Sequence, residues 1–329
     1  MNKILDIQDI VIHYETDDGI VKAINGVSLS LEEGKTLGLV GETGAGKTTL
    51  AKGIMGLLPK TTGRIKNGKI LYSEKDLLAL SESEMQKIRG KHISMIFQDP
   101  MTSLNPVMTV GEQIAEVIAN HENITIKEAM KKAEEMLELV GIPAERSGEY
   151  PHQFSGGMKQ RVIIAISLAC NPKLLIADEP TTALDVTIQA QVLDVIKSLK
   201  AKFHTSMLLI THDLGVVAQN CDDVAIIYAG EIVEYGTIDQ IYHNTKHPYT
   251  IGLFGSIPSL TSEVKRLKPI PGLMPDPTAL PEGCHFCTRC EKAVERCFKE
   301  KPAAKDIGDG HIVKCFLLDE ENDRVKGEE

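Results

Sequence analysis

Residues 41–48 form a glycine-rich motif with the sequence Gly-Glu-Thr-Gly-Ala-Gly-Lys-Thr. It follows an apolar run, 36–40, that predicts a buried strand, and it opens a run, 47–58, that predicts a helix. Glycines let the backbone curl so that its N–H groups point at a phosphate, and the start of a helix adds positive potential. Lys47 is then placed to reach the β- and γ-phosphates, and the Thr48 hydroxyl to hold Mg²⁺. The motif therefore predicts a nucleoside triphosphate site.

A pair of carboxylates, Asp178 and Glu179, closes the apolar run 174–177. A strand that ends here would project Asp178 into the phosphate site, where it can hold Mg²⁺ through water. Glu179 could polarise the attacking water as a general base. An isolated Asp-Glu pair is more often a solvated turn, but the apolar run before it favours the catalytic interpretation.

Three further polar features follow in a fixed order along the chain: Gln98, the stretch 154–158 (Phe-Ser-Gly-Gly-Met) and His212. Ser155 and the two glycine amides after it would lie at a helix start, which is a second anion-binding arrangement. Taken alone, a glutamine or a histidine is more often structural. The series as a whole is far more specific than any member.

The series resembles the ATP-binding cassette (ABC) ATPase family, in which two cassettes clamp two ATP molecules between them. The resemblance implies that 154–158 is the signature that caps the partner's ATP, although Met158 replaces the usual Gln. It also implies that Gln98 contacts the metal and the attacking water, that His212 senses the γ-phosphate and that Tyr14 stacks on adenine. The catalytic residues would be Glu179, His212 and Gln98, and Mg²⁺ would be held by Thr48, Gln98 and Asp178. The ATP-binding residues would be Tyr14, Gly41, Glu42, Thr43, Gly44, Ala45, Gly46, Lys47, Thr48, Thr49, Ser155, Gly156, Gly157 and Asp185.

The surrounding elements predict an α/β fold. Short alternating runs over 5–31, on either side of a turn at 16–19, predict an N-terminal antiparallel β subdomain. The range 81–140 has mostly helical periodicity, which predicts an inserted helical subdomain over about 99–170. Apolar strands at 174–177, 207–210 and 224–228 alternate with helices, which is typical of a parallel sheet. We expect residues 1–250 to form one P-loop ABC cassette.

The chain changes character beyond residue 250, and we expect 251–329 to form a separate C-terminal extension. Seven prolines lie between 248 and 281, where helical periodicity fades, and the charged end 319–329 is expected to fray. Five of the seven cysteines follow the prolines, at positions 284, 287, 290, 297 and 315. In a reducing cytosol such a cluster favours metal binding over disulfides.

This tail, together with the stretch 97–106 (Phe-Gln-Asp-Pro-Met-Thr-Ser-Leu-Asn-Pro), resembles the ATPase subunits of bacterial dipeptide and oligopeptide importers. The resemblance implies a structural [4Fe–4S] cluster. Its ligands would be Cys284, Cys290, Cys297 and Cys315. Cys287 is a fifth candidate, because it makes a Cys-x₂-Cys-x₂-Cys run, and spacing alone does not say which four bind. Four thiolates also suit Zn²⁺, which remains the alternative.

Composition restricts the function further. Of the 329 residues, 42% are hydrophobic and 25% charged, with a net charge of −10 that argues against electrostatic binding to nucleic acid. The longest apolar runs fall well short of the roughly 20 residues that span a bilayer, and the N-terminus lacks a signal-peptide pattern. We therefore expect a cytosolic chain.

The resemblance places that chain on the cytoplasmic face of a bacterial membrane. Its partners would be two transmembrane permease subunits, a second ATPase subunit (related but distinct, or identical) and, indirectly, an extracytoplasmic peptide-binding protein. A nickel importer is the nearest alternative. A soluble ABC protein acting on ribosomes or DNA, or an exporter, fits less well.

Overall fold

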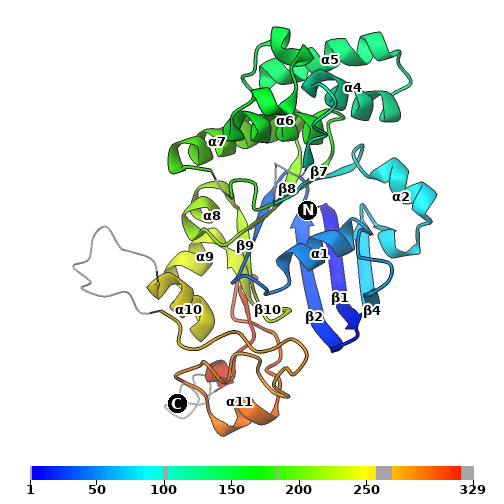
Figure 1. Cartoon of the computed structure of the whole chain (residues 1–329). Coiled ribbons are helices and arrows are strands. Elements are labelled where there is room, and N and C mark those ends of the chain that lie inside the picture. The colour runs from blue at the N-terminus through cyan, green and yellow to red at the C-terminus, as the bar shows by residue number, and fades with distance from the viewer. Residues whose placement is uncertain (1, 99–102, 183, 257–268, 320–329) are drawn as a thin grey trace.

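The computed structural model describes residues 2–98, 103–182, 184–256 and 269–319 (Figure 1). Its strands form two sheets, and the helices between residues 110 and 139 lie in a lobe at the top of Figure 1. The predicted motif residues at 99–102, Ala183 and most of the charged end lie outside the described residues.

The smaller sheet is antiparallel and has the strand order β2-β1-β4-β5. Its strands are β1 (Lys3–Thr16), β2 (Gly19–Glu32), β4 (Gly63–Tyr72) and β5 (Lys75–Asp76). The predicted N-terminal hairpin is confirmed, with Thr16 paired to Gly19 across the turn. Alternate side chains of β1 and β2, such as Ile10, Ile12 and Ile24, are fully buried. This burial gives the sheet one core face, as its alternating sequence requires.

The larger sheet has the order β11-β12-β10-β9-β3-β8-β7-β6. Its strands are β3 (Thr36–Val40), β6 (Ile93–Ile96), β7 (Leu174–Asp178), β8 (Ser206–Thr211), β9 (Asp223–Tyr228), β10 (Glu231–Thr237), β11 (Lys305–Asp306) and β12 (Ile312–Val313). The five strands from β9 to β6 are parallel, which confirms the predicted parallel α/β core. Every residue of β3, β7 and β8 is buried, because helices cover one face of the sheet and the smaller sheet and a helix at 47–54 cover the other.

Two parts of this sheet depart from expectation. The strand β6 lies in a range that we expected to be mostly helical, because four apolar residues are too few for periodicity to separate strand from helix. The antiparallel strands β10, β12 and β11 extend the sheet beyond β9, and none of them was predicted.

The helices are α1 (Lys47–Ile54), α2 (Glu82–Ile88), α4 (Val110–His121), α5 (Ile126–Leu139), α6 (Gly156–Leu168), α7 (Val186–Phe203), α8 (Leu214–Asn220), α9 (Ile238–His243), α10 (Pro248–Gly255) and α11 (Glu295–Lys299), with short 3₁₀ turns at Leu77–Ala79, Ala144–Gly148 and Pro151–Gln153. Helix α1 ends four residues before the predicted Leu58. Gly56 takes a left-handed φ of 62°, and the N–H of Leu57 bonds to the carbonyl of Lys52 at 2.8 Å. This pattern is a Schellman motif, which ends a helix before any proline can.

The helical lobe is built on α4 and α5. Each helix begins with a capping box, Thr109 with Glu112 and Thr125 with Glu128, which satisfies the first N–H groups of the helix. Ile114, Ile118, Ala129, Ala133 and Leu137 are fully buried within the lobe, and α6 packs against both helices. Figure 1 shows this lobe above the sheets, joined to them through α6 and α7.

The C-terminal segment, defined here as residues 269–319, packs back against the cassette. The expectation that helices stop near Pro248 is wrong for 248–255, which form α10 with Pro248 in its first turn, where a missing N–H costs nothing. Residues 269–319 are mostly irregular, but Val313 of β12 pairs with Glu234 of β10. The segment therefore continues the large sheet. The expected domain boundary at about 250 stays a prediction.

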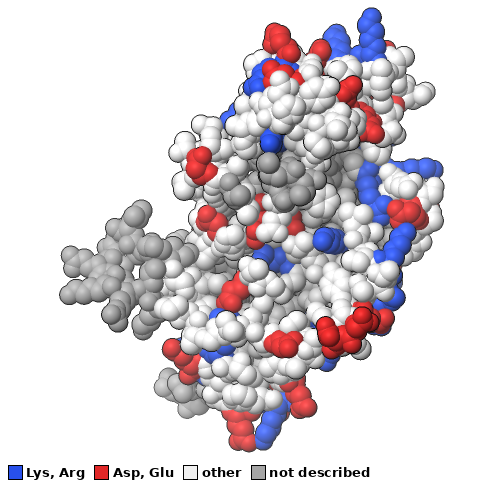
Figure 2. All heavy atoms as spheres, viewed as in Figure 1, with Lys and Arg blue, Asp and Glu red and all other residues white. Residues whose placement is uncertain are grey.

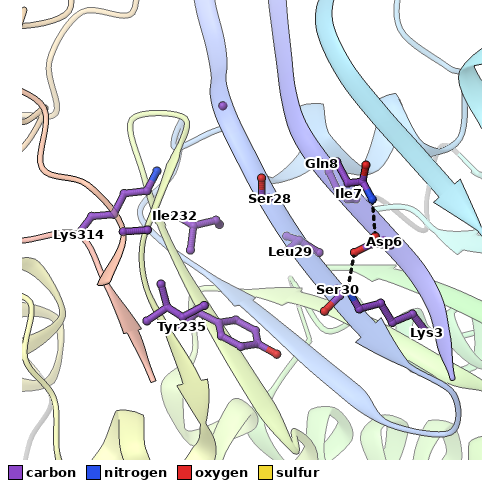
Figure 3. A pocket seen from close by; sticks show the side chains of 13 residues that line it. Lys3, Asp6, Ile7, Gln8, Ser28, Leu29, Ser30, Ile232, Tyr235 and Lys314 are labelled. Carbon is purple, nitrogen blue, oxygen red and sulfur yellow. Dashed lines mark hydrogen bonds and ion pairs between the residues drawn. The ribbon is translucent and has the colours of Figure 1, made fainter. Parts of the chain in front are cut away.

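A cleft of about 490 Å³ marks where the two sheets diverge (Figure 3). Ser28 and Leu29 of β2 lie on one wall, and Ile232 and Tyr235 of β10 face them with Lys314 of the C-terminal segment. The C-terminal segment thus forms part of the wall of this cleft. Figure 2 shows that acidic and basic side chains are interspersed over the face that it draws.

Candidate nucleotide-binding and catalytic site

The glycine-rich motif forms a loop between β3 and α1, as predicted. Gly46 has a left-handed φ of 105° and ends the loop one residue before α1. A Cβ at Gly41 would lie 2.2 Å from the carbonyl oxygen of Ile227, and one at Gly46 would lie 2.6 Å from that of Ala23. Only glycine fits such contacts, so these two positions fix the path of the loop between the sheets.

Lys47 points back into this loop. Its ammonium donates to the carbonyl oxygens of Gly41 at 2.7 Å and Glu42 at 3.0 Å, and the residue is only 6% exposed. Burial lowers the pKa of Lys47, whereas the carboxylates of Glu179 and Asp178 oppose that shift. The loop thus holds a cation at its centre, which suits an anionic ligand such as a phosphate.

A pocket of about 240 Å³ opens beside the loop. It gathers nine residues predicted for the site with Val21, Ala23 and Pro277, which were not predicted. The nine are Tyr14, Thr43, Gly44, Gly46, Lys47, Thr48, Thr49, Gln98 and Glu179. The hydroxyl of Tyr14 donates to Thr49 Oγ1 at 3.2 Å, which ties the β1 aromatic ring to the start of α1. Pro277 was missed from the sequence because it lies far from the other pocket residues along the chain and belongs to no motif.

Glu179 lies at the centre of a hydrogen-bonded cluster. Gln98 Nε2 donates to Glu179 Oε2 at 2.8 Å, and Thr182 Oγ1 donates to the same oxygen at 3.0 Å. His212 Nδ1 lies 3.1 Å from Glu179 Oε1. Burial raises the pKa of Glu179, but the hydrogen bonds from His212 and Thr182 outweigh that effect, so the pKa is lowered. The group is therefore poised as a carboxylate that can accept a proton.

Asp178 ends β7 beside Thr48, and it is 1% exposed. Burial raises its pKa, and a hydrogen bond from the Thr48 side chain opposes the shift. Its Oδ1 atom is buried without a hydrogen-bond partner among the described residues. A buried carboxylate oxygen of this kind calls for a ligand, and carboxylate and hydroxyl oxygens are what Mg²⁺ prefers. The residues present therefore fit the predicted Mg²⁺ site.

The signature residues and Asp185 lie elsewhere in the molecule. Ser155 caps α6 and accepts from the N–H of Met158 at 3.4 Å, and Asp185 caps α7 and accepts from Ile188 at 2.9 Å. Ser155, Gly156, Gly157 and Asp185 are not among the residues that line the pocket beside Lys47. One chain thus carries the two halves of the predicted ATP site in separate places.

The five C-terminal cysteines converge on one small cavity of about 20 Å³. Burial raises the pKa of the Cys284 thiol to about 12 and that of Cys315 to about 11. Within the described ranges, no three His, Cys, Asp or Glu side chains are grouped as ligands of a single metal ion. A [4Fe–4S] cluster makes a different demand, because its four cysteines bind different iron atoms. The cavity is also lined by His247 and Lys292, and the [4Fe–4S] cluster stays a prediction.

Fold and site together define the class of this protein, which is an ABC-type ATPase. Residues 24–182 match the family described as ABC transporter, and residues 233–297 match the oligopeptide/dipeptide transporter C-terminal region. Among solved structures, a dimeric ATP-binding cassette in a post-hydrolysis state bound to ADP and Pi aligns with a TM-score of 0.64. It is 26% identical and covers 71% of this chain and 98% of its own.

Two curated relatives narrow the class. The oligopeptide transport ATP-binding protein OppD of Bacillus subtilis (strain 168) is 52% identical over 99% of this chain and 92% of its own length. The dipeptide transport ATP-binding protein DppD of the same organism is 49% identical, over 97% and 96%. The chain belongs to the family of ABC transporter ATP-binding proteins that carry the oligopeptide/dipeptide C-terminal region.

A membrane-crossing helix would need both length and apolar character. None of the helices within the described parts of the chain has both.

Proposed function

We propose that this protein is the ATP-hydrolysing subunit of an importer for dipeptides or oligopeptides and works at the cytoplasmic face of the membrane. The observation that carries the proposal is the hydrogen-bonded cluster around Glu179, which lies beside the phosphate loop. The chain is also similar to a peptide-transport ATP-binding protein over 99% of its length. ATP hydrolysis is the property of the class, and the peptide cargo is supported by the names of the relatives.

Lys47 and the loop amides would hold the phosphates. Thr48, Gln98 and Asp178 would hold Mg²⁺, which would supply positive charge to neutralise the phosphates. Glu179 takes the proton of the attacking water as the water oxygen bonds to the γ-phosphorus and the bond to ADP breaks. His212 and Thr182 orient the Glu179 carboxylate through their hydrogen bonds to it.

Catalysis requires a second cassette in this proposal. Ser155, Gly156 and Gly157 would cap the ATP of the partner, because they do not line the pocket of their own chain. The dimeric arrangement of the solved relative supports this role. A distinct but related subunit is the proposed partner.

The permease subunits have a suitable docking surface on the helical lobe. A groove of about 630 Å³ lies between α4 and the start of α5. Its members are Val107, Met108, Glu112, Ala115, Glu116, Ala119, Asn120, Ile126 and Met130. Val107 is 79% exposed and Ile126 is 64% exposed, so the groove offers apolar side chains that another surface could cover. A short helix of a permease subunit is the proposed occupant.

The Glu179→Gln variant tests the catalytic assignment. The amide keeps the hydrogen-bonding shape but cannot accept the proton, so ATP binding should persist while turnover falls roughly 10²–10⁴-fold. That loss corresponds to about 3–5 kcal/mol on the barrier. Phosphate release and nucleotide affinity measured on the same preparation separate the two effects. Near-normal hydrolysis by this variant would remove Glu179 from its role.

The same variant tests the cargo in the native host. Uptake of labelled dipeptide, longer peptide and Ni²⁺ should be compared in cells that carry Glu179→Gln and in cells that carry the wild-type chain. Selective loss of peptide uptake is the expected result. Unchanged peptide uptake with lost nickel accumulation would contradict the peptide assignment.

We also propose that residues 251–329 form an extension organised around a [4Fe–4S] cluster with a structural role. Cys284, Cys290, Cys297 and Cys315 would hold it, and Cys287 lines the same cavity as a possible replacement. Anaerobically purified protein should then be brown, with matched iron and acid-labile sulfide. Stoichiometric zinc in place of iron would overturn this assignment.

A further inference from the structure

The C-terminal segment reaches the phosphate loop through Arg289. This arginine lies between two of the cysteines, and its side chain is only 6% exposed. Its Nη1 donates to Glu42 Oε2 at 3.0 Å and to the Tyr228 hydroxyl at 3.3 Å, and its Nε donates to the carbonyl of Pro271 at 2.8 Å. Glu42 is the second residue of the phosphate loop, so the ion pair joins residues that are far apart in the sequence.

An aromatic cluster supports this ion pair. Tyr228 of β9, Tyr249 of α10 and Phe286 of the C-terminal segment lie with ring centroids 4.6–5.4 Å apart. The Arg289 guanidinium lies 5.7 Å from the Tyr228 ring centroid, which adds a cation–π contact. The Tyr249 hydroxyl accepts from the N–H of Glu42 at 3.0 Å. Glu42 is therefore held at both its backbone and its carboxylate.

The position of Glu42 matters because its carbonyl shapes the loop. That oxygen accepts from the ammonium of Lys47 at 3.0 Å and from the N–H of Ala45 at 3.1 Å. A shift of Glu42 would therefore move the lysine and the amides that face a phosphate. The pair is also largely buried on the Arg289 side, so loss of either partner leaves a charge poorly compensated.

Two further contacts bring the same segment to the nucleotide pocket. Pro277 lines the pocket, and its carbonyl accepts from the N–H of Lys22 at 2.9 Å. The Met274 methyl group lies 3.1 Å from the position that a Cβ would take on Gly44. The segment thus touches the loop at two places and the pocket at a third.

We propose that Arg289 is a positioning residue of the phosphate loop, which holds Glu42 so that the loop is shaped for nucleotide before nucleotide arrives. The proposal rests on the assignment of the 41–48 loop as the nucleotide site. It makes the C-terminal segment part of the ATP-binding apparatus. By linkage, nucleotide binding stabilises the packing of that segment to the same degree that the segment favours nucleotide.

The test is a titration of the full chain with a fluorescent ATP analogue and Mg²⁺, combined with steady-state ATPase kinetics. Arg289→Gln should weaken nucleotide binding by about 10-fold, within the usual range of such couplings, and raise KM with little change in kcat, because the Glu179 cluster is untouched. Arg289→Lys should recover part of the affinity, since it keeps the charge but loses the fork that serves three acceptors.

The Glu42→Gln variant breaks the same ion pair from the loop side and leaves the sequence of the C-terminal segment unchanged. It should weaken binding by a similar factor, and the double variant should be no worse than either single variant. Lys301→Gln is the matched control, because Lys301 also joins the segment to the cassette, through an ion pair to Glu231 at 2.6 Å that includes no residue of 41–48. This control should bind nucleotide as the wild-type chain does.

Wild-type affinity in Arg289→Gln or in Glu42→Gln, or additive effects of the two, would overturn the proposal. A loss of affinity in Lys301→Gln equal to that in Arg289→Gln would also overturn it, since general loosening of the segment would then explain both. Lys47→Ala separates the underlying assignment: if this variant still binds nucleotide with wild-type affinity, the loop is not the site at all.

Discussion

At the residue scale, Glu179 has a backbone conformation that is unusual for a residue with a side chain. Its φ is 48°, in the left-handed region that a non-glycine residue rarely adopts, and its N–H is bonded to the carbonyl of Ile210 at 2.8 Å. Such strain persists only where neighbouring contacts impose it, and it is common at functional sites. Gln98, Thr182 and His212 all meet the carboxylate that results. The strained turn thus aims one side chain at three partners.

The effect of these partners on the pKa of Glu179 should be visible in the pH dependence of turnover. Thr182→Val removes a hydrogen bond that favours the charged form of Glu179, so the pKa of Glu179 should rise. A base with a higher pKa becomes protonated earlier as the pH falls, and the acid limb of the kcat profile should therefore move to higher pH. Turnover measured against pH, from acid to neutral, checks the direction.

Thr181→Val is the control for this prediction. Thr181 is the adjacent threonine, and its backbone carbonyl, which accepts from the N–H of Leu184, is kept in the variant. Its acid limb should coincide with that of the wild-type chain. An unmoved limb in Thr182→Val would show that the Thr182 hydroxyl does not tune the base.

At the element scale, a pair of neighbouring glycines at the start of α6 differ sharply in their surroundings. A Cβ at Gly157 would lie 2.5 Å from Ile188 Cγ2 on α7, whereas one at Gly156 would lie 3.9 Å from Leu184 Cδ2. Gly157→Ala should therefore push α6 from α7 and lower the free energy of unfolding by about 1–3 kcal/mol. Gly156→Ala should leave it unchanged or raise it slightly, since alanine favours helix. Urea denaturation of both variants decides, and equal stabilities would contradict the packing argument.

The elements that could be predicted from sequence are those whose signal is local. The strands β3, β7, β8 and β9 are continuous apolar runs, and the loop at 41–48 has a specific pattern of glycines. Strand β10 was missed because it carries buried glutamates. Glu234 is fully buried and accepts from the N–H groups of Lys246 and His247 and from His311 Nε2 at 2.9 Å. No local pattern announces such partners.

The residues of the candidate site also divide into those with a local sequence signal and those without one. Lys47, Asp178, Glu179 and Gln98 were predicted from motifs, and the structure brings them to one place. Pro277, Arg289 and the Tyr249 hydroxyl were missed, because their relation to the loop exists only after the chain has folded back on itself. Spacing in a sequence cannot report such a contact.

At the scale of the whole molecule, the nucleotide site and the proposed permease surface lie on different subdomains. Gln98 donates a hydrogen bond to Glu179 in the core, and the helical lobe that carries the α4–α5 groove comes later in the sequence, with α4 beginning at Val110. In the proposed function, a permease helix that moves in this groove would move the lobe, and Gln98 would carry that motion to Glu179 through its hydrogen bond.

The groove should be required for assembly but not for folding. Ile126→Asp places a charge in the groove at a side chain that is 64% exposed, so the fold should tolerate it while a docked apolar helix should not. Co-purification with the permease subunits from membranes should fall at least about 10-fold, because burying an unpaired carboxylate costs more than the 1.4 kcal/mol of a tenfold change. Leu273→Asp, at an 89% exposed leucine outside the groove, should retain the complex. If both variants assemble equally well, the permeases dock on another surface, and the link through Gln98 loses its support.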